Sequence, residues 1–423
     1  MRRLLLILLL TSFQGIALRA DDAAVAMRLA DVCTLLSGNA LGFDTVYSEQ
    51  FLRQVPPLRL TTIAQQMMLE AGPCTGMRIV ERTSAHQVWA EARTDKGYTI
   101  PVMLTVASTP PYRIEGLFLR PPVKAQTSLN DLLTTIRGLR GRVSLTITDC
   151  THGSAMAAID SSTYLPIGST FKLYVLGELV RQIRQGTRSW GDVVQLDTNW
   201  RSLPSGRLHT WPHGSQLTLH TLASMMISES DNTATDMLIR LLGPDRIAQH
   251  QTTMGHAQPT LNQPFLSTLQ AFKLKYADTV SAQSYIRASP NERSALLRRV
   301  DTAVSRDDIQ LTTRIVHADS IEWFATTAEL CRAMDWFRRM AQQTGDSTAM
   351  SILGINTGIP IASTWKRVAY KGGSEPGMIN MTHMLQHANG TWYALSVTWV
   401  DTVSGVDEAT FAGYVEQLIS MLK

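Results

Sequence analysis

The sequence predicts an α+β protein of two domains, a small one followed by a larger one that contains an antiparallel sheet. Apolar residues recur at helical spacing over 24–37 and 58–71, ahead of a β-rich stretch. Residues 120–128 then break the pattern with two prolines and polar residues. Beyond them, β-rich segments stand at both ends of a long helical stretch. One sheet is therefore assembled from distant parts of the chain, with a helical half inserted between them.

The first residues are typical of an export signal. Arg2 and Arg3 precede the apolar run 4–10, and small residues offer cleavage sites after Ala17 or Ala20. The apolar run is too short to span a bilayer, so we interpret residues 1–20 as a secretory signal peptide, with an uncleaved anchor as the alternative. We expect a periplasmic or secreted protein with no stable membrane association after cleavage.

Composition argues against several classes of partner. The chain has 423 residues, a net charge of +4 and no cluster of Lys and Arg interleaved with aromatics, so no nucleic-acid partner is predicted. Two histidine pairs have i,i+4 spacing, but His209 and His213 bracket a proline, and His383 and His387 lie in a predicted strand. We therefore predict no metal and no organic cofactor. The oligomeric state is not predicted.

The four cysteines become candidates for disulfides if the chain is exported. They are Cys33, Cys74, Cys150 and Cys331, and they allow three full pairings that the sequence does not rank. Cys33 and Cys74 both fall in the first domain and form the favoured pair. The other two are either paired or buried as free thiols.

The first domain is predicted over residues 21–120, with a linker over 121–127. Its helices are followed by the β-rich segments "QVWAEART", "YTIPVMLTV" and "YRIEGLFL". No catalytic constellation occurs in it. The domain is expected to shape a cleft, bind a second ligand or mediate pairing, and no residue distinguishes these roles.

The second domain is predicted over residues 128–423. It opens with a helix over 129–141 and strands over 142–149 and 155–161, and a long helical stretch runs from Ser169 to about Gln343. Strands return in the segments "RVAYKGG", "GMINMTHMLQH" and "TWYALSVTWV", the last two joined by a hairpin at Asn389–Gly390. An amphipathic helix closes the chain.

Three short motifs occur in order within this domain. Ser169 and Lys172 form a Ser-x-x-Lys at a predicted helix start, Ser230-Asp231-Asn232 follows, and Lys371-Gly372-Gly373 ends a predicted strand. A Ser-x-x-Lys alone is expected roughly once or twice by chance in a chain of this length. The ordered set of three makes coincidence a poor explanation. It also argues against the alternative that Lys172 only extends its ammonium to the surface.

The residue types suit nucleophilic catalysis. Positions i and i+3 share a helix face, so Ser169 Oγ and Lys172 Nζ can meet, and burial lowers the pKa of a lysine until it can accept the serine proton. The backbone N–H of Ser169 at the helix start suits an oxyanion. Ser230 could relay a proton to the leaving group and Asn232 could hold a substrate amide. Lys371 could pair with a substrate carboxylate and polarise Ser230.

These motifs resemble those of class A β-lactamases and the related penicillin-recognising D,D-peptidases over nearly all of residues 128–423. The likeness is most specific in "IGSTFKL" and "SDNTATDMLI". The resemblance implies a five-stranded antiparallel sheet flanked by helices, plus an all-helical half. It also implies an acyl-enzyme on Ser169, a second oxyanion donor at the backbone N–H of Ser374, and substrate binding at Gly373.

A closer likeness is to two-domain serine hydrolases, including one associated with clavulanic-acid biosynthesis. It rests on "IGSTFKLYVLGEL", "SLPSG", "NQPFLSTLQAFKLK" and "YKGGSEPG". Those proteins carry a small steroid-isomerase-like domain before the hydrolase, which residues 21–120 would match.

Two departures from the class A pattern limit the expected activity. Residues 250–278 contain no glutamate to activate the deacylating water, and Gly372 replaces the usual hydroxyl residue that would bind the substrate carboxylate, although Ser374 could partly compensate. We therefore expect a small-molecule substrate, a β-lactam, an ester or a cell-wall peptide, with slow turnover of β-lactams. The alternatives are a D,D-peptidase, a β-lactam side-chain esterase, and a binding module that captures a β-lactam without hydrolysing it.

Overall fold

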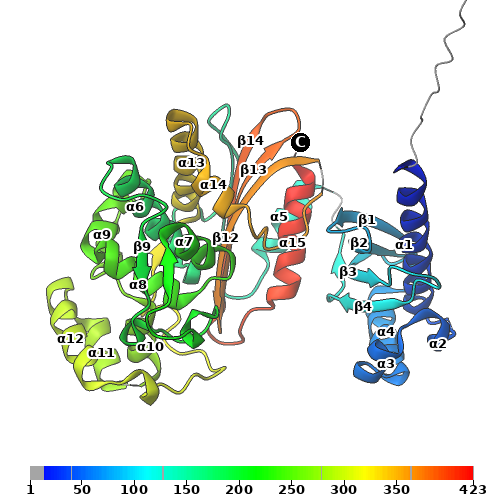
Figure 1. The fold of residues 1–423 in the computed structure, drawn as a ribbon, viewed down its shortest axis with the longest axis horizontal. Helices are drawn as coiled ribbons and strands as arrows, with labels where there is room; N and C mark the ends of the chain where they lie inside the picture. The colour runs from blue at the N-terminus through cyan, green and yellow to red at the C-terminus, as the bar shows by residue number, and fades with distance from the viewer. Residues whose placement is uncertain (1–13, 40, 126–127, 278, 363, 423) are drawn as a thin grey trace, which may run out of the picture. The chain divides into compact units, whose positions relative to one another are not determined.

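The computed structural model describes residues 14–39, 41–125, 128–277, 279–362 and 364–422. They form two compact units, coloured along the chain in Figure 1. The first comprises Met1–Ser128, Pro360–Ser363 and Ala409–Met421, and the second Leu129–Ile359, Thr364–Glu408 and Leu422–Lys423. Of the predicted signal peptide, residues 1–13 lie outside the described residues and 14–20 begin a helix. No described helix is long and apolar enough to cross a membrane.

The first unit sets helices against an antiparallel sheet of order β1-β2-β3-β4, with β5 paired to β3. The sequence predicts β2 and β3 at their observed bounds but misses β1, because β1 has no alternation of buried and exposed residues to reveal it. The elements are α1 (Gln14–Leu36), α2 (Phe43–Val46), α3 (Glu49–Gln54), α4 (Pro57–Ala71), β1 (Cys74–Arg82), β2 (Gln87–Thr94), β3 (Tyr98–Val106), β4 (Ile114–Leu119), β5 (Val123–Lys124) and, from the end of the chain, α15 (Glu408–Met421).

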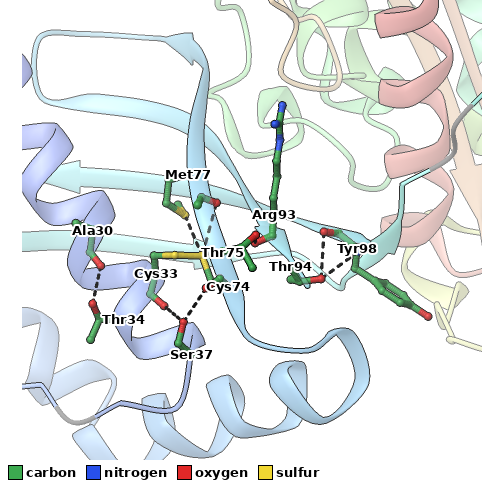
Figure 2. The surroundings of a disulfide bond; sticks show 11 residues. Ala30, Cys33, Thr34, Ser37, Cys74, Thr75, Met77, Arg93, Thr94 and Tyr98 are labelled. Atoms are coloured by element: carbon green, nitrogen blue, oxygen red, sulfur yellow. Dashed lines mark hydrogen bonds between the residues drawn. A yellow bond between two sulfur atoms is a disulfide. The ribbon is translucent and has the colours of Figure 1, made fainter. Parts of the chain in front are cut away.

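A disulfide links the first helix of this unit to its first strand. Cys33 in α1 is bonded to Cys74 at the start of β1, which confirms the favoured pair (Figure 2). Ser37 Oγ donates to both cysteine carbonyls, at 2.8 Å to Cys33 and 3.0 Å to Cys74. Beside the bond, Val25, Leu29 and Val32 place one face of α1 in the core formed with β2 and β3. Cys150 and Cys331 are free thiols.

The second unit contains the predicted five-stranded antiparallel sheet, in the order β12-β13-β14-β6-β7. Every residue of β14 is buried, as expected for a central strand covered on both faces. The predicted fold class is confirmed, with strands from both ends of the unit meeting in one sheet. These strands are β6 (Arg142–Asp149), β7 (Ser154–Ile159), β12 (Trp365–Glu375), β13 (Met378–His387) and β14 (Trp392–Val400).

The helical half lies between β7 and β12 along the chain, and helix α6 (Lys172–Arg184) is at its centre. All residues from 172 to 179 are buried, because α6 contacts α7, α8, α9 and α13. The remaining elements are α5 (Leu129–Arg137), which ends before the predicted residue 141, β8 (Leu165–Pro166), β9 (Val193–Gln195), β10 (Gln216–Thr218), α7 (Leu219–Ser228), α8 (Asn232–Leu242), α9 (Pro244–Thr253), α10 (Thr268–Tyr276), α11 (Thr279–Arg287), α12 (Pro290–Ala303), β11 (Phe324–Ala325), α13 (Thr327–Thr344) and α14 (Thr348–Leu353).

Removing the disulfide should loosen the first unit. The bond joins residues 41 positions apart, so the paired change Cys33→Ala/Cys74→Ala is expected to lower the free energy of unfolding of that unit by about 4 kcal/mol. Hydrogen exchange of peptides from β1 to β3, followed by mass spectrometry on the whole chain, measures the effect. Cys150→Ala, which removes a free thiol of the second unit, is the control. Unchanged exchange in the paired variant would contradict the expectation.

Candidate functional site

Ser169 lies in a short 3₁₀ turn, η1 (Gly168–Phe171), directly before α6. The predicted helix start is therefore a tighter turn, and regular α-helix begins at Lys172. Gly168 has a φ of +48°, a conformation that glycine adopts without strain. Thr170 Oγ1 donates to Asn380 Oδ1 in β13 at 2.8 Å. The turn is thus fixed against the sheet and leaves Ser169 half-buried.

Strand β12 passes directly against this turn. A Cβ added to Gly373 would stand 2.3 Å from the carbonyl oxygen of Ile167 and 2.4 Å from the backbone nitrogen of Ser169, so only glycine fits. A Cβ added to Gly168 would stand 3.2 Å from the backbone nitrogen of Ser374. The backbone nitrogens of Ser169 and Ser374 therefore lie at one junction, as an oxyanion hole requires. The strand continues to Glu375, beyond its predicted end at Gly373.

Ser230 is held in an unusual backbone conformation between α7 and α8. Its φ is +55°, which is uncommon for a residue other than glycine. The adjacent Asp231 side chain caps α8 by accepting from Ala234 N at 2.9 Å, and its other oxygen accepts from Arg207 N at 2.7 Å and Leu208 N at 2.8 Å. These three bonds to a fully buried carboxylate fix the turn that presents Ser230.

Lys172 points toward Ser230 and Asn232. Its Nζ donates to the Ser230 carbonyl at 2.5 Å, to Ser230 Oγ at 3.0 Å and to Asn232 Oδ1 at 2.8 Å. The spacing of Ser169 and Lys172 predicts that those two side chains meet. Within the described residues, Ser169 Oγ makes no hydrogen bond, and the contacts of Lys172 go to Ser230 and Asn232. The structure therefore unites the first and second motifs through Lys172.

Lys371 reaches the same serine from β12. Its Nζ donates to Ser230 Oγ at 3.2 Å and to the Gly372 carbonyl at 2.5 Å. Ser230 Oγ thus lies between two lysine amines, one from α6 and one from β12. The three motifs predicted from the sequence converge on this one hydroxyl.

The surroundings of both lysines disfavour the charged form of the side chain. Burial lowers the pKa of Lys172 well below its usual value, and the nearby Lys371 lowers it further, against the opposing effect of Asp236 and Asp231. Burial lowers the pKa of Lys371 to about 7. A lysine with a strongly lowered pKa can accept a proton near neutral pH, which is the property a general base needs.

A cavity of about 290 Å³ opens at Ser169. Asn232 and Ser374 line it next to the nucleophile candidate, and aromatic side chains form much of its wall. Lys172 and Lys371 do not line it. The lining residues are Gly168, Ser169, Phe171, Pro204, Ser205, Asn232, Thr268, Ala271, Phe272, Lys275, Tyr276, Leu311, Thr312, Glu322, Trp323, Ser374, Glu375 and Pro376.

A cluster of one lysine and two glutamates lies in the wall of this cavity and was not predicted. Lys275 Nζ donates to Glu322 Oε1 at 2.7 Å and to both oxygens of Glu375, at 2.7 and 2.6 Å. Burial, with the charge of Glu322 nearby, raises the pKa of Glu375 to about 8. Lys275 is 47 positions from Glu322 and 100 from Glu375 in the sequence, so no local sequence signal links them.

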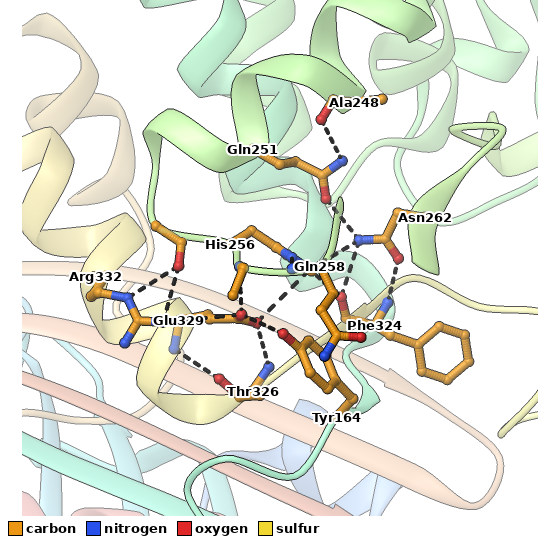
Figure 3. Close-up of polar contacts among 12 residues, drawn as sticks. Tyr164, Ala248, Gln251, His256, Gln258, Asn262, Phe324, Thr326, Glu329 and Arg332 are labelled. Carbon is orange, nitrogen blue, oxygen red and sulfur yellow. Dashed lines mark hydrogen bonds and ion pairs between the residues drawn. The ribbon is translucent and has the colours of Figure 1, made fainter. Parts of the chain in front are cut away.

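The loop 256–262, which follows α9, is anchored by a polar network (Figure 3). Asn262 Oδ1 accepts from Phe324 N at 2.8 Å, and Asn262 Nδ2 donates to Gln251 Oε1 at 2.7 Å. Glu329 Oε1 accepts from Tyr164 Oη and from Ala257 N, both at 2.7 Å. The network fixes β11 and so also the preceding Trp323, whose ring stacks on Phe171 with centroids 3.7 Å apart.

In the described part of the chain, no group of three or more His, Cys, Asp and Glu side chains is placed to hold a metal ion.

Comparison with known proteins identifies the family to which the sequence is similar. The sequence matches the β-lactamase enzyme family over residues 124–410. A solved β-lactamase from Sphaerobacter thermophilus DSM 20745 is 19% identical, covers 69% of this chain and 93% of its own, and has a TM-score of 0.49. One from Chitinophaga pinensis DSM 2588 is 17% identical, with 69% and 95% covered and a TM-score of 0.47. The structure of PBP-A is 15% identical, with 72% and 100% covered and a TM-score of 0.48. No curated protein matches the sequence.

Replacing Lys371 should stabilise the fold at neutral pH. The folded pKa of about 7 lies below the ordinary 10.5, so the unfolded chain binds more protons between those values and stability rises with pH across that window. At pH 7, Lys371→Met is expected to raise the free energy of unfolding by more than about 1 kcal/mol, the value of one pK unit. The variant should also show a smaller rise in stability from pH 7 to pH 10.

Denaturant unfolding at several pH values measures both effects. Lys366→Met, which removes an exposed lysine of the same strand, is the matched control. Equal pH dependence in the wild type and Lys371→Met would contradict the lowered pKa.

Removing the Asp231 carboxylate should lower the free energy of unfolding. Asp231→Ala leaves three backbone N–H groups without their acceptor, so it is expected to cost about 3 kcal/mol of unfolding free energy. Calorimetry of the whole chain measures the loss. Asp192→Ala, which removes a half-buried aspartate whose carboxylate accepts from Ser189 N at a surface turn, should cost much less. A loss no greater than that of Asp192→Ala would contradict the assigned role of Asp231.

Proposed function

We propose, from the premise that the chain belongs to the β-lactamase enzyme family, that it is an exported serine hydrolase acting through an acyl-enzyme on Ser169. One observation carries the proposal. Lys172 and Lys371 approach Ser230 Oγ at 3.0 and 3.2 Å, beside a cavity that Ser169 lines. Binding alone gives no reason to bury two lysine amines beside one hydroxyl, whereas amines with lowered pKa values next to a hydroxyl suit proton transfer.

Acylation begins with attack of Ser169 Oγ on the substrate carbonyl carbon. Neutral Lys172 takes the proton of Ser169, and the backbone N–H groups of Ser169 and Ser374 donate to the oxyanion that forms. Collapse of the tetrahedral intermediate expels the leaving amine or alkoxide, which receives a proton from Ser230 Oγ. Lys172 then returns its proton to Ser230, so the serine and lysine leave the step as they entered it.

The contacts of Lys172 support its role as base. An ammonium has three N–H donors, and the three acceptors around Lys172 Nζ use all of them. The neutral amine has two donors and one lone pair, so it keeps two of these contacts and can accept from Ser230 Oγ–H or Ser169 Oγ–H. The hydroxyl of Ser230 is therefore suited to pass a proton in either direction.

Deacylation requires a base that activates water, and the described residues of the site offer no free carboxylate for this role. The loop 256–262 presents no carboxylate, and the two glutamates that line the cavity, Glu322 and Glu375, are both bonded to Lys275. The oxygens of both carboxylates already accept hydrogen bonds, from Lys275 and, in Glu322, also from the backbone N–H of Trp323, so neither is free to orient a water. We therefore propose slow turnover of β-lactams and a long-lived acyl-enzyme. The same observation favours the D,D-peptidase or side-chain esterase as the second candidate, since neither need hydrolyse a β-lactam.

Mass spectrometry of the intact protein tests the proposal. Wild type incubated with benzylpenicillin is expected to gain one penicilloyl adduct that persists for minutes or longer, while Ser169→Ala gains none. Lys172→Ala should slow acylation by about 10²–10⁴-fold, the usual contribution of a general base. Ser84→Ala, which removes an exposed serine of the first unit, is the control.

An acetoxymethyl cephalosporin in a parallel series distinguishes the candidates. Loss of only its acetyl group, abolished in Ser169→Ala, would favour the esterase. An adduct that survives Ser169→Ala would remove Ser169 as nucleophile. No adduct and no turnover of either compound would contradict action on β-lactams.

A further inference from the structure

The cluster of Lys275, Glu322 and Glu375 joins three segments of the second unit that are far apart in the sequence. Lys275 belongs to α10, Glu322 lies just before β11, and Glu375 is the last residue of β12. Lys275 Nζ lies 2.7 Å from Glu322 Oε1 and 2.7 and 2.6 Å from the two oxygens of Glu375. One side chain of α10 therefore ties the end of β12 to the segment that leads into β11.

The three side chains balance one another without a ligand. Burial lowers the pKa of Lys275, but the charges of Glu322 and Glu375 outweigh burial and raise this pKa above its usual value. Burial, the charge of Glu322 and a hydrogen bond with it raise the pKa of Glu375 to about 8, so Glu375 holds a proton at neutral pH. One ammonium and one carboxylate then cancel. A buried ion pair keeps its geometry when its other hydrogen-bonding groups are satisfied in this way.

At one end, the cluster holds the segment that carries the oxyanion donor of Ser374. Glu375 follows Ser374 directly in β12. In the described sheet β12 is the outermost strand, so backbone pairing with β13 restrains it on one edge only. The contact of Lys275 with both oxygens of Glu375 adds a second restraint at the residue next to the donor.

At the other end, the cluster holds the turn that carries Ser169. Glu322 precedes Trp323, whose carbonyl accepts from Ile167 N at 3.0 Å and whose ring stacks on Phe171 with centroids 3.7 Å apart. Ile167 is the N-cap of η1 and Phe171 is its last residue, so Trp323 contacts the turn on both sides of Ser169. The position of Ser169 thus depends on Trp323 and, through the chain, on Glu322.

Both ends matter because the two backbone N–H groups of the oxyanion site come from different segments. Such donors stabilise the transition state only when both lie at hydrogen-bonding distance from the place where the charge develops. A displacement of about 1 Å can cost about 10²-fold in rate. A tie between the supports of the two donors therefore has a direct effect on catalysis.

We propose that Lys275 is a positioning residue for acylation. It ties Glu375 to Glu322 and thereby holds the backbone N–H groups of Ser374 and Ser169 at the separation that an oxyanion requires. Lys275 lines the cavity, but its contacts with the glutamates use all three N–H donors, so it acts through them and not on the substrate. The inference rests on the proposed function, because it concerns the step in which the oxyanion forms.

Replacement of Lys275 tests the inference. Lys275→Met nearly keeps the length of the side chain and removes the tie, so the second-order rate constant of acylation by benzylpenicillin should fall about 10²-fold. Mass spectrometry of the intact protein over time measures it. Lys273→Met is the matched control, because Lys273 is a buried lysine of the same helix that pairs with Asp301 and does not line the cavity. The control should acylate at the wild-type rate.

A second pair of variants keeps the test decisive if Lys275→Met does not fold. Glu375→Met leaves Lys275 and Glu322 as a balanced ion pair and removes only the tie to β12, so it should slow acylation as Lys275→Met does. Glu375→Gln presents an amide oxygen that still accepts from Lys275 Nζ, and it should keep most of the wild-type rate. Equal slowing in Glu375→Gln and Glu375→Met would contradict the tie.

An oxyanion analogue separates positioning from a general effect on the cavity. Phenylacetamidomethylboronic acid forms a tetrahedral adduct with Ser169 Oγ and places an oxygen in the oxyanion site, whereas benzylpenicillin bound to a Ser169→Ala protein reports the ground state alone. Lys275→Met should weaken boronate binding about 10²-fold. In the Ser169→Ala background it should leave the affinity for benzylpenicillin unchanged. A merely structural role of Lys275 would weaken both.

Two outcomes would overturn the inference: an unchanged acylation rate in Lys275→Met, or equal losses of affinity for the boronate and for benzylpenicillin. A wild type that binds the boronate but is not acylated by benzylpenicillin would overturn the proposed action on β-lactams, and the boronate comparison would still decide the role of Lys275. A wild type that binds no boronate would overturn both.

Discussion

The site in the second unit depends on two buried lysine amines that both lie within hydrogen-bonding distance of the Ser230 hydroxyl. Lys172 comes from the central helix α6 and Lys371 from strand β12, and both are buried. Water would solvate such charges, and a protein interior does not, so the site is stable only where carbonyl and amide oxygens replace water and where one amine gives up its proton. The carbonyl of Ser230, the amide of Asn232 and the carbonyl of Gly372 are those replacements.

Two backbone features make that arrangement possible. Ser230 adopts a left-handed conformation that turns its carbonyl and hydroxyl toward Lys172, and the capping carboxylate of Asp231 stabilises the turn. At the other side of the site, Gly373 lets β12 approach the η1 turn more closely than any side chain would permit. The catalytic geometry is thus set mainly by the main chain. The side chains that carry the chemistry follow from where the helices and the strand are held.

The order and type of the main elements could be predicted from the sequence, and so could the three motifs, because each is a local pattern. The contacts between motifs could not. The spacing of Ser169 and Lys172 indicates that they share a helix face, yet the contacts of Lys172 depend on a turn 58 residues away. The cluster of Lys275, Glu322 and Glu375 is equally non-local. The sequence shows only that position 372 lacks a hydroxyl side chain. That the Tyr370 ring lies beside Gly372 depends on how β12 packs, which the sequence does not indicate.

The division of the chain into units has a consequence for how the protein is made. The first unit includes residues 409–421, so its ion pair between Arg120 and Glu416, 2.6 Å apart, joins an early segment to one of the last. Synthesis proceeds from the N-terminus, and residues 129–359 and 364–408 of the second unit are made before Glu416 exists. The first unit therefore acquires its full set of contacts only after residues 409–421 have been made and are free to fold.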